Sequence, residues 1–375
     1  MALDELKLIA NEQRWQDALS MIKEKPELRE LNPEYVSILS WRSNAKLGYE
    51  KDAEKELDIA IKISPTNAML QRAKGDFHKV REEWKFALEC YKTAVVLRED
   101  IPAYWICYAL AQEKLGLISE AQHSLETTVS LDPNRRQWWL KLAYICRLNK
   151  NLEGALSAYD KALEMKNDVQ ITAMRDETLR QMESGSMVAS AEYYDKVYSA
   201  SEKYQTHGSD SVYKSAWEYI LSILNEREVT SILDLGCGPG QFAEFLVEAN
   251  MDVSYVGLDF SSVAIQQAKN RCPQFSFYRE TLPLKSYSQF GNPDVLICTE
   301  VLEHVENDLE LLASYPKGKY LIITVPNFDS FGHVRYFITK DEVLERYSHI
   351  FEEPVIGQVN LSEKSILWVI KGIIS

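Results

Sequence analysis

Three glycines at alternate positions are the feature of this sequence whose spacing points most directly to chemistry. The stretch ILDLGCGPGQF contains Gly236, Gly238 and Gly240, and Asp234 stands just before them. An apolar run leads into the stretch and a helix-like pattern follows it. Glycine at a turn from strand to helix permits unusual backbone torsions and close approach of a ligand to the main chain. The stretch therefore predicts a cofactor loop.

The spacing of these glycines distinguishes two classes of cofactor. A dinucleotide loop follows G-x-G-x-x-G, which would need glycine where this sequence has Gln241. The observed pattern is D-x-G-x-G-x-G, and the carboxylate of Asp234 does not suit a phosphate. It suits a ligand that carries an ammonium and a sulfonium group. S-adenosylmethionine carries both and has no phosphate, so we expect this cofactor.

Strand-like and helix-like segments alternate from residue 231 onward, which implies a parallel sheet with helices on both faces. Two late strands without a long helix between them suggest an antiparallel end to the sheet. The expected strands are 231–235, 253–259, 275–280, 293–299, 319–327, 351–359 and 365–373. In doubly wound sheets the ligand binds at the carboxyl ends of the strands. The loop thus lies where a cofactor would bind.

Polar residues follow three further strands at the same expected edge. Asp259 ends the second strand, where an acid can accept hydrogen bonds from both ribose hydroxyls. Glu280 and Thr281 follow the third strand, where an adenine edge would lie. Thr299 and Glu300 follow the fourth, where the backbone could hold the ammonium. The ordered set strengthens the expectation of S-adenosylmethionine.

The strings LDLGCGPGQF and EVLEHV resemble those of class I S-adenosylmethionine-dependent methyltransferases, across about residues 190–375. This resemblance implies a seven-stranded, Rossmann-like α/β fold. EVLEHV is also similar to the motif of ubiquinone-biosynthesis O-methyltransferases and of bacterial sugar-modifying relatives. We expect Cys237 to offer only its backbone N–H. The expected cofactor-binding residues are Asp234, Gly236, Cys237, Gly238, Gly240, Gln241, Asp259, Phe260, Ser261, Glu280, Thr281, Leu282, Thr299, Glu300, Tyr194 and Tyr204.

Two histidines are candidates for the general base that a hydroxyl acceptor would need. His304 lies in EVLEHV, and His333 lies in FGHVRYFITKDEV, which resembles a substrate-side loop. Structural roles for both remain open, and His349 fits a structural role better. No group of His, Cys and Asp residues has metal-ligand spacing, so no metal site is expected.

Residues 187–228 precede the first strand and are rich in tyrosine. In methyltransferases of this class such a segment covers the cofactor as a lid, and exclusion of water assists methyl transfer. Tyr194, Tyr198 and Tyr204 are candidates for stacking or hydrogen bonding there. The alternative is a helix packed on the sheet with a surface loop.

A 34-residue period organises the first half of the chain, since small or apolar residues recur at fixed phases. Alanine recurs at 53, 87, 121 and 155, and the pattern resembles tetratricopeptide repeats. We expect an all-α solenoid over 1–184, with the methyltransferase domain over 185–375. The expected repeats are 3–32, 33–66, 67–100, 101–134 and 135–168, followed by a capping helix to 184. A solenoid of this kind predicts a docking surface for a protein partner, and the alternative is an appendage that stabilises or dimerises the protein.

Composition excludes several classes of protein. The net charge is −14, which argues against nucleic-acid binding, and no apolar run is long enough for a transmembrane helix. Scattered cysteines and the absence of a signal peptide indicate a cytoplasmic protein.

The expected activity is O-methylation of a small hydroxylated acceptor, such as a sugar or nucleotide-sugar of surface polysaccharide synthesis. Methylation of a protein or peptide held by the repeats, or a non-catalytic protein that binds the cofactor, are the alternatives.

Overall fold

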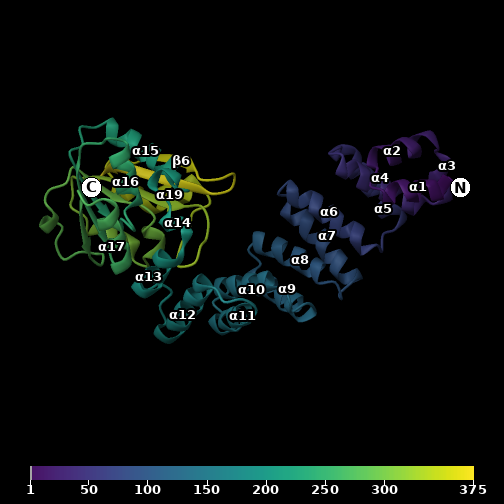
Figure 1. Cartoon of the computed structure of the whole chain (residues 1–375), viewed down its shortest axis with the longest axis horizontal. Helices are drawn as coiled ribbons and strands as arrows, with labels where there is room; N and C mark the ends of the chain where they lie inside the picture. The colour runs from purple at the N-terminus through teal and green to yellow at the C-terminus, as the bar shows by residue number, and fades with distance from the viewer. Residues whose placement is uncertain (1) are drawn as a thin grey trace. The chain divides into compact units, whose positions relative to one another are not determined.

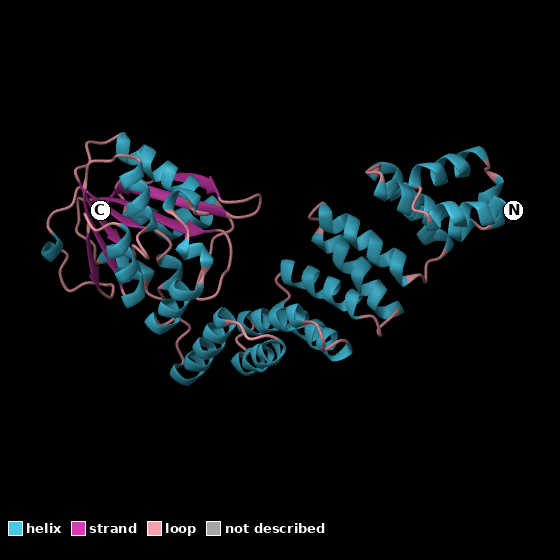
Figure 2. Cartoon of the chain, viewed as in Figure 1, coloured by secondary structure: helices cyan, strands magenta, loops and turns pink. Residues whose placement is uncertain are grey.

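The computed structural model describes residues 2–375 and comprises two compact units, Met1–Lys166 and Asn167–Ser375. The first unit consists of helices, whereas the second contains the strands, drawn in magenta in Figure 2. Element labels follow Figure 1. Each unit is described by itself.

The first unit is a series of antiparallel helix pairs with short connections. Four pairs follow the expected register, whereas the first pair is followed by an additional short helix. The helices are α1 (Ala2–Asn11), α2 (Trp15–Glu24), α3 (Glu27–Leu31), α4 (Pro33–Lys46), α5 (Glu50–Ile63), α6 (Ala68–Val80), α7 (Trp84–Leu97), α8 (Pro102–Lys114), α9 (Ile118–Leu131), α10 (Arg136–Leu148) and α11 (Leu152–Met165). The all-α tetratricopeptide architecture is confirmed.

Small residues at fixed phases let the helices of each pair approach closely. The alanines at 53, 87, 121 and 155 are all fully buried. In α6, a Cβ on Gly75 would lie 2.5 Å from Cε1 of Tyr91, which is itself fully buried. The indole N–H of Trp105 donates to the carbonyl of Glu99 at 2.8 Å. One repeat later, Trp139 donates in the same way to Pro133 at 2.8 Å. Tryptophan at this phase therefore fixes the turns that precede α8 and α10.

The boundary between the two units differs from the expected one after residue 184. Helix α12 (Val169–Ser184) belongs to the second unit, because it packs on α13 (Ala191–Ala200). Glu177 of α12 is buried and accepts hydrogen bonds from the backbone N–H and the hydroxyl of Ser190. These bonds tie α12 to the start of α13, so α12 is not simply an end cap of the repeats.

The second unit is built on a seven-stranded sheet with the order β3-β2-β1-β4-β5-β7-β6. Neighbouring strands from β3 to β5 are parallel, and β7 is antiparallel to both β5 and β6. The strands are β1 (Ser231–Leu235), β2 (Ser254–Asp259), β3 (Ser276–Arg279), β4 (Val295–Cys298), β5 (Tyr320–Pro326), β6 (Val355–Asn360) and β7 (Ile366–Ile373). The expected doubly wound sheet with an antiparallel end is confirmed.

Helices cover both faces of this sheet, as Figure 2 shows. One apolar core joins a sheet face that includes Ile232 to helices α15, α16 and α17. The other core joins a face that includes Leu233 to α18 and α19. The remaining helices are α14 (Glu202–Gln205), α15 (Lys214–Asn225), α16 (Gln241–Glu248), α17 (Ser262–Arg271), α18 (Asp308–Ala313), α19 (Lys340–Tyr347) and the short 3-10 turns η1 (Gly208–Asp210), η2 (Ser288–Phe290), η3 (Leu302–His304) and η4 (Ser348–Ile350).

The strand register places the cofactor candidates beside one another. Asp234 of β1 pairs with Gly257 of β2 and with Ile297 of β4. Because these strands are parallel, their carboxyl ends meet at one edge, where the strand order reverses between β1 and β4. Among residues 2–375, no helix is both long and apolar enough to cross a membrane.

Candidate functional site

A cavity of about 470 Å³ opens at this edge of the sheet. The carboxyl ends of β1, β2 and β4 form its floor, and α13, α14 and α15 contribute to its walls. The expected residues that line it are Asp234, Gly236, Cys237, Gly238, Gln241, Asp259, Phe260, Glu280, Thr281, Leu282, Thr299, Glu300, Tyr194, Tyr204, His304 and His333. Gly240 and Ser261 do not line it.

Asp234 has one carboxylate oxygen with a partner and one without. The hydroxyl of Tyr255 donates to Oδ2, whereas Oδ1 is buried with no hydrogen-bond partner in the described chain. The side chain is only 2% exposed. Burial raises the pKa of Asp234 to about 7. A buried carboxylate oxygen without a donor favours a cationic ligand group at this position.

Asp259 holds the glycine loop and the start of α17 together. Its Oδ2 accepts from the backbone N–H of Gly238 at 3.0 Å, and its Oδ1 accepts from Ser261 at 2.8 Å. Burial raises the pKa of Asp259 to about 6, although these bonds oppose the rise. A carboxylate has about four acceptor positions. Two backbone donors therefore leave capacity for ligand hydroxyls.

The loop glycines have torsions and contacts that a side chain would disturb. Gly236 has φ +94°, and a Cβ there would lie 2.2 Å from Cγ2 of Val301. Gly240 has φ +79° and lies against Ala268 of α17, which explains why it does not line the cavity. Glycine at 240 thus lets the glycine loop pack closely against α17, and it does not contact the ligand cavity.

The expected use of the Cys237 backbone N–H by the cofactor is not what the structure shows. That N–H donates to the carbonyl of Leu258 at 2.9 Å, and the N–H of Gly236 donates to the same carbonyl at 2.8 Å. Burial also raises the pKa of the Cys237 thiol well above its usual value. Cys237 therefore holds the loop against β2 and keeps its thiol protonated.

Ser261 acts at the N-terminus of α17 rather than in the cavity. Its hydroxyl oxygen accepts from the backbone N–H of Ala264 at 3.0 Å and caps the helix. The same hydroxyl donates to Asp195 of α13, which also accepts from Ser262 and Val263. Burial alone would raise the pKa of Asp195, but these hydrogen bonds hold it below its usual value. Asp195 thus fastens α13 to α17, a role that sequence spacing did not reveal.

The tyrosine-rich segment forms one wall of the cavity. Tyr194 lies 5.4 Å from Phe260 between ring centroids, and Tyr198 lies 4.8 Å from Tyr204. All four rings line the cavity. These rings give the space above the strand ends an aromatic wall.

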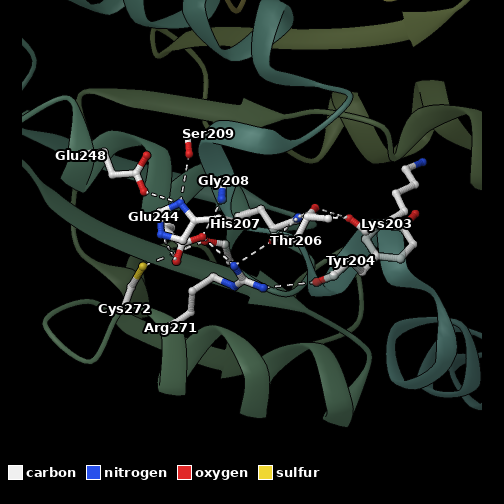
Figure 3. Close-up of polar contacts among 12 residues, drawn as sticks. Lys203, Tyr204, Thr206, His207, Gly208, Ser209, Glu244, Glu248, Arg271 and Cys272 are labelled. Carbon is white, nitrogen blue, oxygen red and sulfur yellow. Dashed lines mark hydrogen bonds and ion pairs between the residues drawn. The ribbon is translucent and has the colours of Figure 1, made fainter.

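The chain after α13 is fastened to α16 and α17 by a polar network, drawn in Figure 3. Gln241 donates its amide to the carbonyls of Lys203 and Thr206 at 3.2 and 3.0 Å. Arg271 lies 2.6 Å from Glu244, which also accepts from the backbone N–H of Gly208 at 2.7 Å. Gln241 was expected to contact the cofactor, yet its amide is engaged in positioning this wall.

His304 and His333 both line the cavity, and their rings are in contact. Their ring centroids lie 4.8 Å apart at an interplanar angle of 73°. Nδ1 of His304 lies 3.1 Å from the carbonyl oxygen of Gly332, and Nδ1 of His333 lies 3.2 Å from that of Phe328. The Tyr194 hydroxyl lies 2.8 Å from Nδ1 of His304. Because a carbonyl oxygen only accepts, the contact of His333 with Phe328 is a hydrogen bond when Nδ1 carries the hydrogen and Nε2 keeps its lone pair. At His304 the Gly332 carbonyl and the Tyr194 hydroxyl both contact Nδ1, so the role of this nitrogen depends on the tautomer.

Both imidazoles are neutral near pH 7. Burial lowers the pKa of His304 to about 4. Burial, together with the neighbouring His304, lowers the pKa of His333 to about 3. A neutral imidazole can accept a proton or bind a cation through Nε2, and the low pKa makes either histidine a weak base.

Two ionisable residues of this region, Glu303 and Lys203, were not predicted from the sequence. Glu303 is 0% exposed, and burial followed by the nearby Glu300 raises its pKa well above the usual value. Burial also raises the pKa of Glu300 to about 6. Lys203 lines the cavity with its Nζ 2.8 Å from the hydroxyl of Tyr213, and burial lowers its pKa. Glu303 could have been predicted from its place next to His304 in EVLEHV. No sequence signal pointed to Lys203.

Comparisons with known proteins agree with this division of the chain. Residues 233–316 match the family model described as a methyltransferase domain, and residues 108–169 match a tetratricopeptide repeat model. A trans-aconitate 2-methyltransferase of Rhodopseudomonas palustris is 32% identical over 108 residues, which are 28% of this chain and 41% of the relative. A ubiquinone biosynthesis O-methyltransferase of Rickettsia bellii is 32% identical over 116 residues, which are 29% of this chain and 47% of the relative. The chain thus spans less than half the length of these curated relatives.

Two solved structures are similar to part of the chain. YrrB, titled a tetratricopeptide protein with an unusual peptide-binding site, is 18% identical with a TM-score of 0.40 and covers 48% of this chain and 90% of its own. A MamA fragment from Desulfovibrio magneticus RS-1 is 18% identical with a TM-score of 0.39 and covers 44% of this chain and 93% of its own.

The sheet order, the glycine loop and the two family matches lead to one assignment. This chain joins a segment that matches tetratricopeptide repeats to a segment that matches a methyltransferase domain.

Proposed function

We propose that the second unit binds S-adenosylmethionine and transfers its methyl group to an oxygen of a small hydroxylated acceptor. The single observation that carries this proposal is the unpartnered Oδ1 of buried Asp234, next to Asp259 at the floor of the cavity. An ammonium group would satisfy Oδ1, and ribose hydroxyls would donate to Asp259. The residues present therefore fit this cofactor.

Other residues would hold the rest of the cofactor. Glu280, Thr281 and Leu282 line the cavity beyond β3, where the adenine would lie, and Thr299 and Glu300 line it beyond β4. When bound, S-adenosylmethionine supplies a methyl group that its sulfonium makes reactive. The protein's contribution is alignment of the two reactants in a site from which water is excluded.

The acceptor would enter on the side of His304 and His333. Nε2 of His304 has no partner among the described residues and could accept a hydrogen bond from an acceptor hydroxyl. Lys203 is the one cationic side chain among the described cavity-lining residues, which also include several carboxylates. This balance supports a neutral, hydroxyl-rich acceptor such as a sugar, in preference to a polyanion. A nucleotide-sugar would have to place its phosphates outside the cavity.

The repeats would serve to dock a protein partner, in keeping with the family resemblance of residues 108–169. Two alternatives to small-molecule methylation are methylation of a docked protein or peptide, and cofactor binding without turnover. Both alternatives keep the same cofactor site; the first has a protein or peptide as the methyl acceptor, and the second has no acceptor.

Calorimetric titration of S-adenosylmethionine and S-adenosylhomocysteine into the full chain tests the cofactor assignment. We expect micromolar binding of both, and Asp259→Ala should weaken it by about 1–3 kcal/mol through loss of charge-assisted hydrogen bonds. The matched control is Asp252→Ala, since Asp252 is exposed just before β2. Absence of binding to the unaltered chain would refute the assignment.

Transfer of labelled methyl groups to defined acceptors tests the second half of the proposal. The panel would contain neutral sugars, nucleotide-sugars and peptides. Label on a sugar would support the proposed acceptor, whereas label on peptides alone would favour the docked-substrate alternative. Binding of cofactor with no label on any acceptor would favour the non-catalytic alternative.

A further inference from the structure

One wall of the cavity is apolar and comes from outside the segment that matches a methyltransferase domain. That match covers residues 233–316, whereas α12 and α13 lie before it and the loop after β5 lies beyond it. Six residues from these segments line the cavity: Met174, Val188, Ala189, Tyr193, Val197 and Phe331. We call this set the apolar wall. None of its side chains carries a charge at neutral pH.

The side chains of the apolar wall pack on one another. Helices α12 and α13, which are in contact, carry much of the wall (Figure 1). Met174 and Phe331 pack on a buried cluster that contains Ala189 and Tyr193, and they are themselves only partly buried. The rings of Tyr193 and Phe331 are stacked, with 4.7 Å between their centroids. Apolar side chains that line a cavity and stay partly exposed leave apolar surface that a ligand can cover.

The apolar wall begins beside the histidine at which we place the acceptor hydroxyl. A Cβ built on Gly332 would lie 3.3 Å from Cβ of Ala189 and 3.5 Å from Nδ1 of His304. The carbonyl oxygen of Gly332 itself lies 3.1 Å from that nitrogen. An acceptor whose hydroxyl reaches His304 would therefore have its neighbouring atoms against the apolar wall.

Polar side chains of α12 hold the chain at Val188 in place. The amide of Gln181 donates at 2.7 Å to the backbone carbonyl that precedes Val188, and Arg180 donates to the carbonyl of Val188. Glu177 accepts from the backbone N–H and the hydroxyl of Ser190 at 3.1 and 2.6 Å. The apolar wall thus stands on a fixed support, which favours selection of a ligand by shape.

The rest of the cavity has a different character. Its carboxylates stand at the ends of the strands or in the turns after them, and the cofactor groups proposed above match Asp234 and Asp259 on that side. The residues proposed for the adenine lie beyond β3, likewise on that side. With the cofactor placed there, the molecule that lies against the apolar wall is the acceptor.

We propose that the apolar wall binds an alkyl or aryl group joined to the hydroxylated acceptor, so that the preferred acceptor is an amphipathic glycoside and not a free sugar. A free sugar would turn hydroxyl groups toward a wall that offers few hydrogen bonds, which costs free energy. Each methylene covered by the wall should instead raise the affinity about fourfold. The identity of the methylated hydroxyl rests on the proposed function, whereas the apolar subsite is a property of the cavity itself.

Calorimetric titration of alkyl β-glucosides into the full chain tests the apolar subsite. Methyl, butyl and hexyl glucoside are compared, below the concentration at which the hexyl compound forms micelles, with and without saturating S-adenosylhomocysteine. We expect hexyl glucoside to bind at least about tenfold more tightly than methyl glucoside. Hexan-1-ol, which lacks the sugar, should bind more weakly than hexyl glucoside, because the sugar hydroxyls also contact the protein.

Two variants of nearly unchanged volume place polar atoms in the apolar wall. Met174→Gln and Val188→Thr should each lower the ratio of hexyl to methyl glucoside affinity at least about threefold. The matched controls are Met182→Gln and Val169→Thr on the same helix, since these residues are 42% and 63% exposed and do not line the cavity. Both controls should keep the ratio of the parent. The unfolding temperature of each variant is measured, so that a lowered ratio in a folded variant identifies a residue of the subsite.

Three results would overturn the apolar subsite. These are equal binding of hexyl and methyl glucoside by the parent chain, an unchanged ratio in both wall variants, or binding of hexan-1-ol as tight as that of hexyl glucoside. Binding of S-adenosylhomocysteine is titrated separately. If it binds while the glucosides show no dependence on chain length, the apolar subsite fails and the cofactor assignment stands. If chain length matters and S-adenosylhomocysteine does not bind, the subsite stands and the proposed function fails.

Discussion

Protonation of Asp234 should make cofactor binding depend on pH. Its pKa is raised to about 7 by burial, and Tyr255 donates to one oxygen while the other is free. Only the carboxylate form can attract the ammonium group. The affinity should therefore rise with pH up to about 7 and level off above it, since the protonated form must lose its proton before it binds.

The size of the effect follows from this pKa. At pH 6, one unit below the pKa of Asp234, about one molecule in eleven holds the carboxylate. The apparent affinity should then be about elevenfold, or ~1.4 kcal/mol, weaker at pH 6 than well above pH 7. Asp259, with a pKa of about 6, adds a further factor of about two. Binding at pH 6 should release about 0.9 proton from Asp234, and binding at pH 8 about 0.1.

Calorimetry with S-adenosylhomocysteine measures both quantities, in pairs of buffers with different ionisation enthalpies at pH 6, 7 and 8. In Asp234→Asn the affinity should be lower at pH 8, and most of the pH dependence should vanish. This variant also reports any contribution from the ligand's own groups. A parent chain with pH-independent affinity and no proton release would refute the reasoning, as would an unchanged pH dependence in Asp234→Asn.

Three further substitutions test the framework around the site. Gly236→Ala should destabilise the second unit by at least about 2 kcal/mol in urea unfolding, because φ is +94° and the new Cβ would lie 2.2 Å from Val301; Val301→Ala should restore part of the loss. Asp195→Ala should increase amide exchange in α13 and cost about 1–2 kcal/mol, because it removes acceptors at the start of α17. Gly75→Ala should lower the stability of the repeats by about 1–3 kcal/mol, because Tyr91 lies 2.5 Å from the new Cβ.

Each of these has a result that would contradict it. A Gly236→Ala chain as stable as the parent would mean that the loop adapts at little cost. Unchanged exchange in α13 after Asp195→Ala would mean that aromatic packing alone holds this helix. For Gly75→Ala, a compensating Tyr91→Leu should recover stability, and failure to recover would point away from the clash. Gly75→Ala should not change the affinity for S-adenosylhomocysteine, because Gly75 lies in the repeats.

The repeat register and the cofactor loop were predictable because local chemistry sets both. A 34-residue period fixed which alanines are buried, and helices α4 to α11 lie within the expected repeats. Glycine at 236 reports a torsion that few other residues adopt, and acidic residues at the ends of parallel strands must meet at one edge.

Other features depend on contacts between residues distant in the sequence. Ser261 and Gln241 follow loops where ligand contacts are common, so both were expected to contact the cofactor. Instead, Ser261 caps α17, and the side-chain amide of Gln241 donates to the backbone carbonyls of Lys203 and Thr206. Sequence spacing also gave no reason to place His333 beside Glu303, because their segments are separate along the chain. The backbone bond from Val334 to Glu303 joins them only in the folded protein.

The sequence by itself was enough to predict the division into repeats and a methyltransferase-like domain. It also predicted the succession of strands and helices along the chain and the acidic residues of the proposed cofactor site, Asp234 and Asp259. Hydrophobic periodicity, glycine torsions and strand direction depend mainly on residues that are close in the sequence. They can therefore be recognised from the sequence alone. The tertiary structure alone decided that Asp234 keeps one carboxylate oxygen without a donor. Burial and hydrogen-bond satisfaction depend on every neighbouring segment at once, and they determine where a cation can be bound.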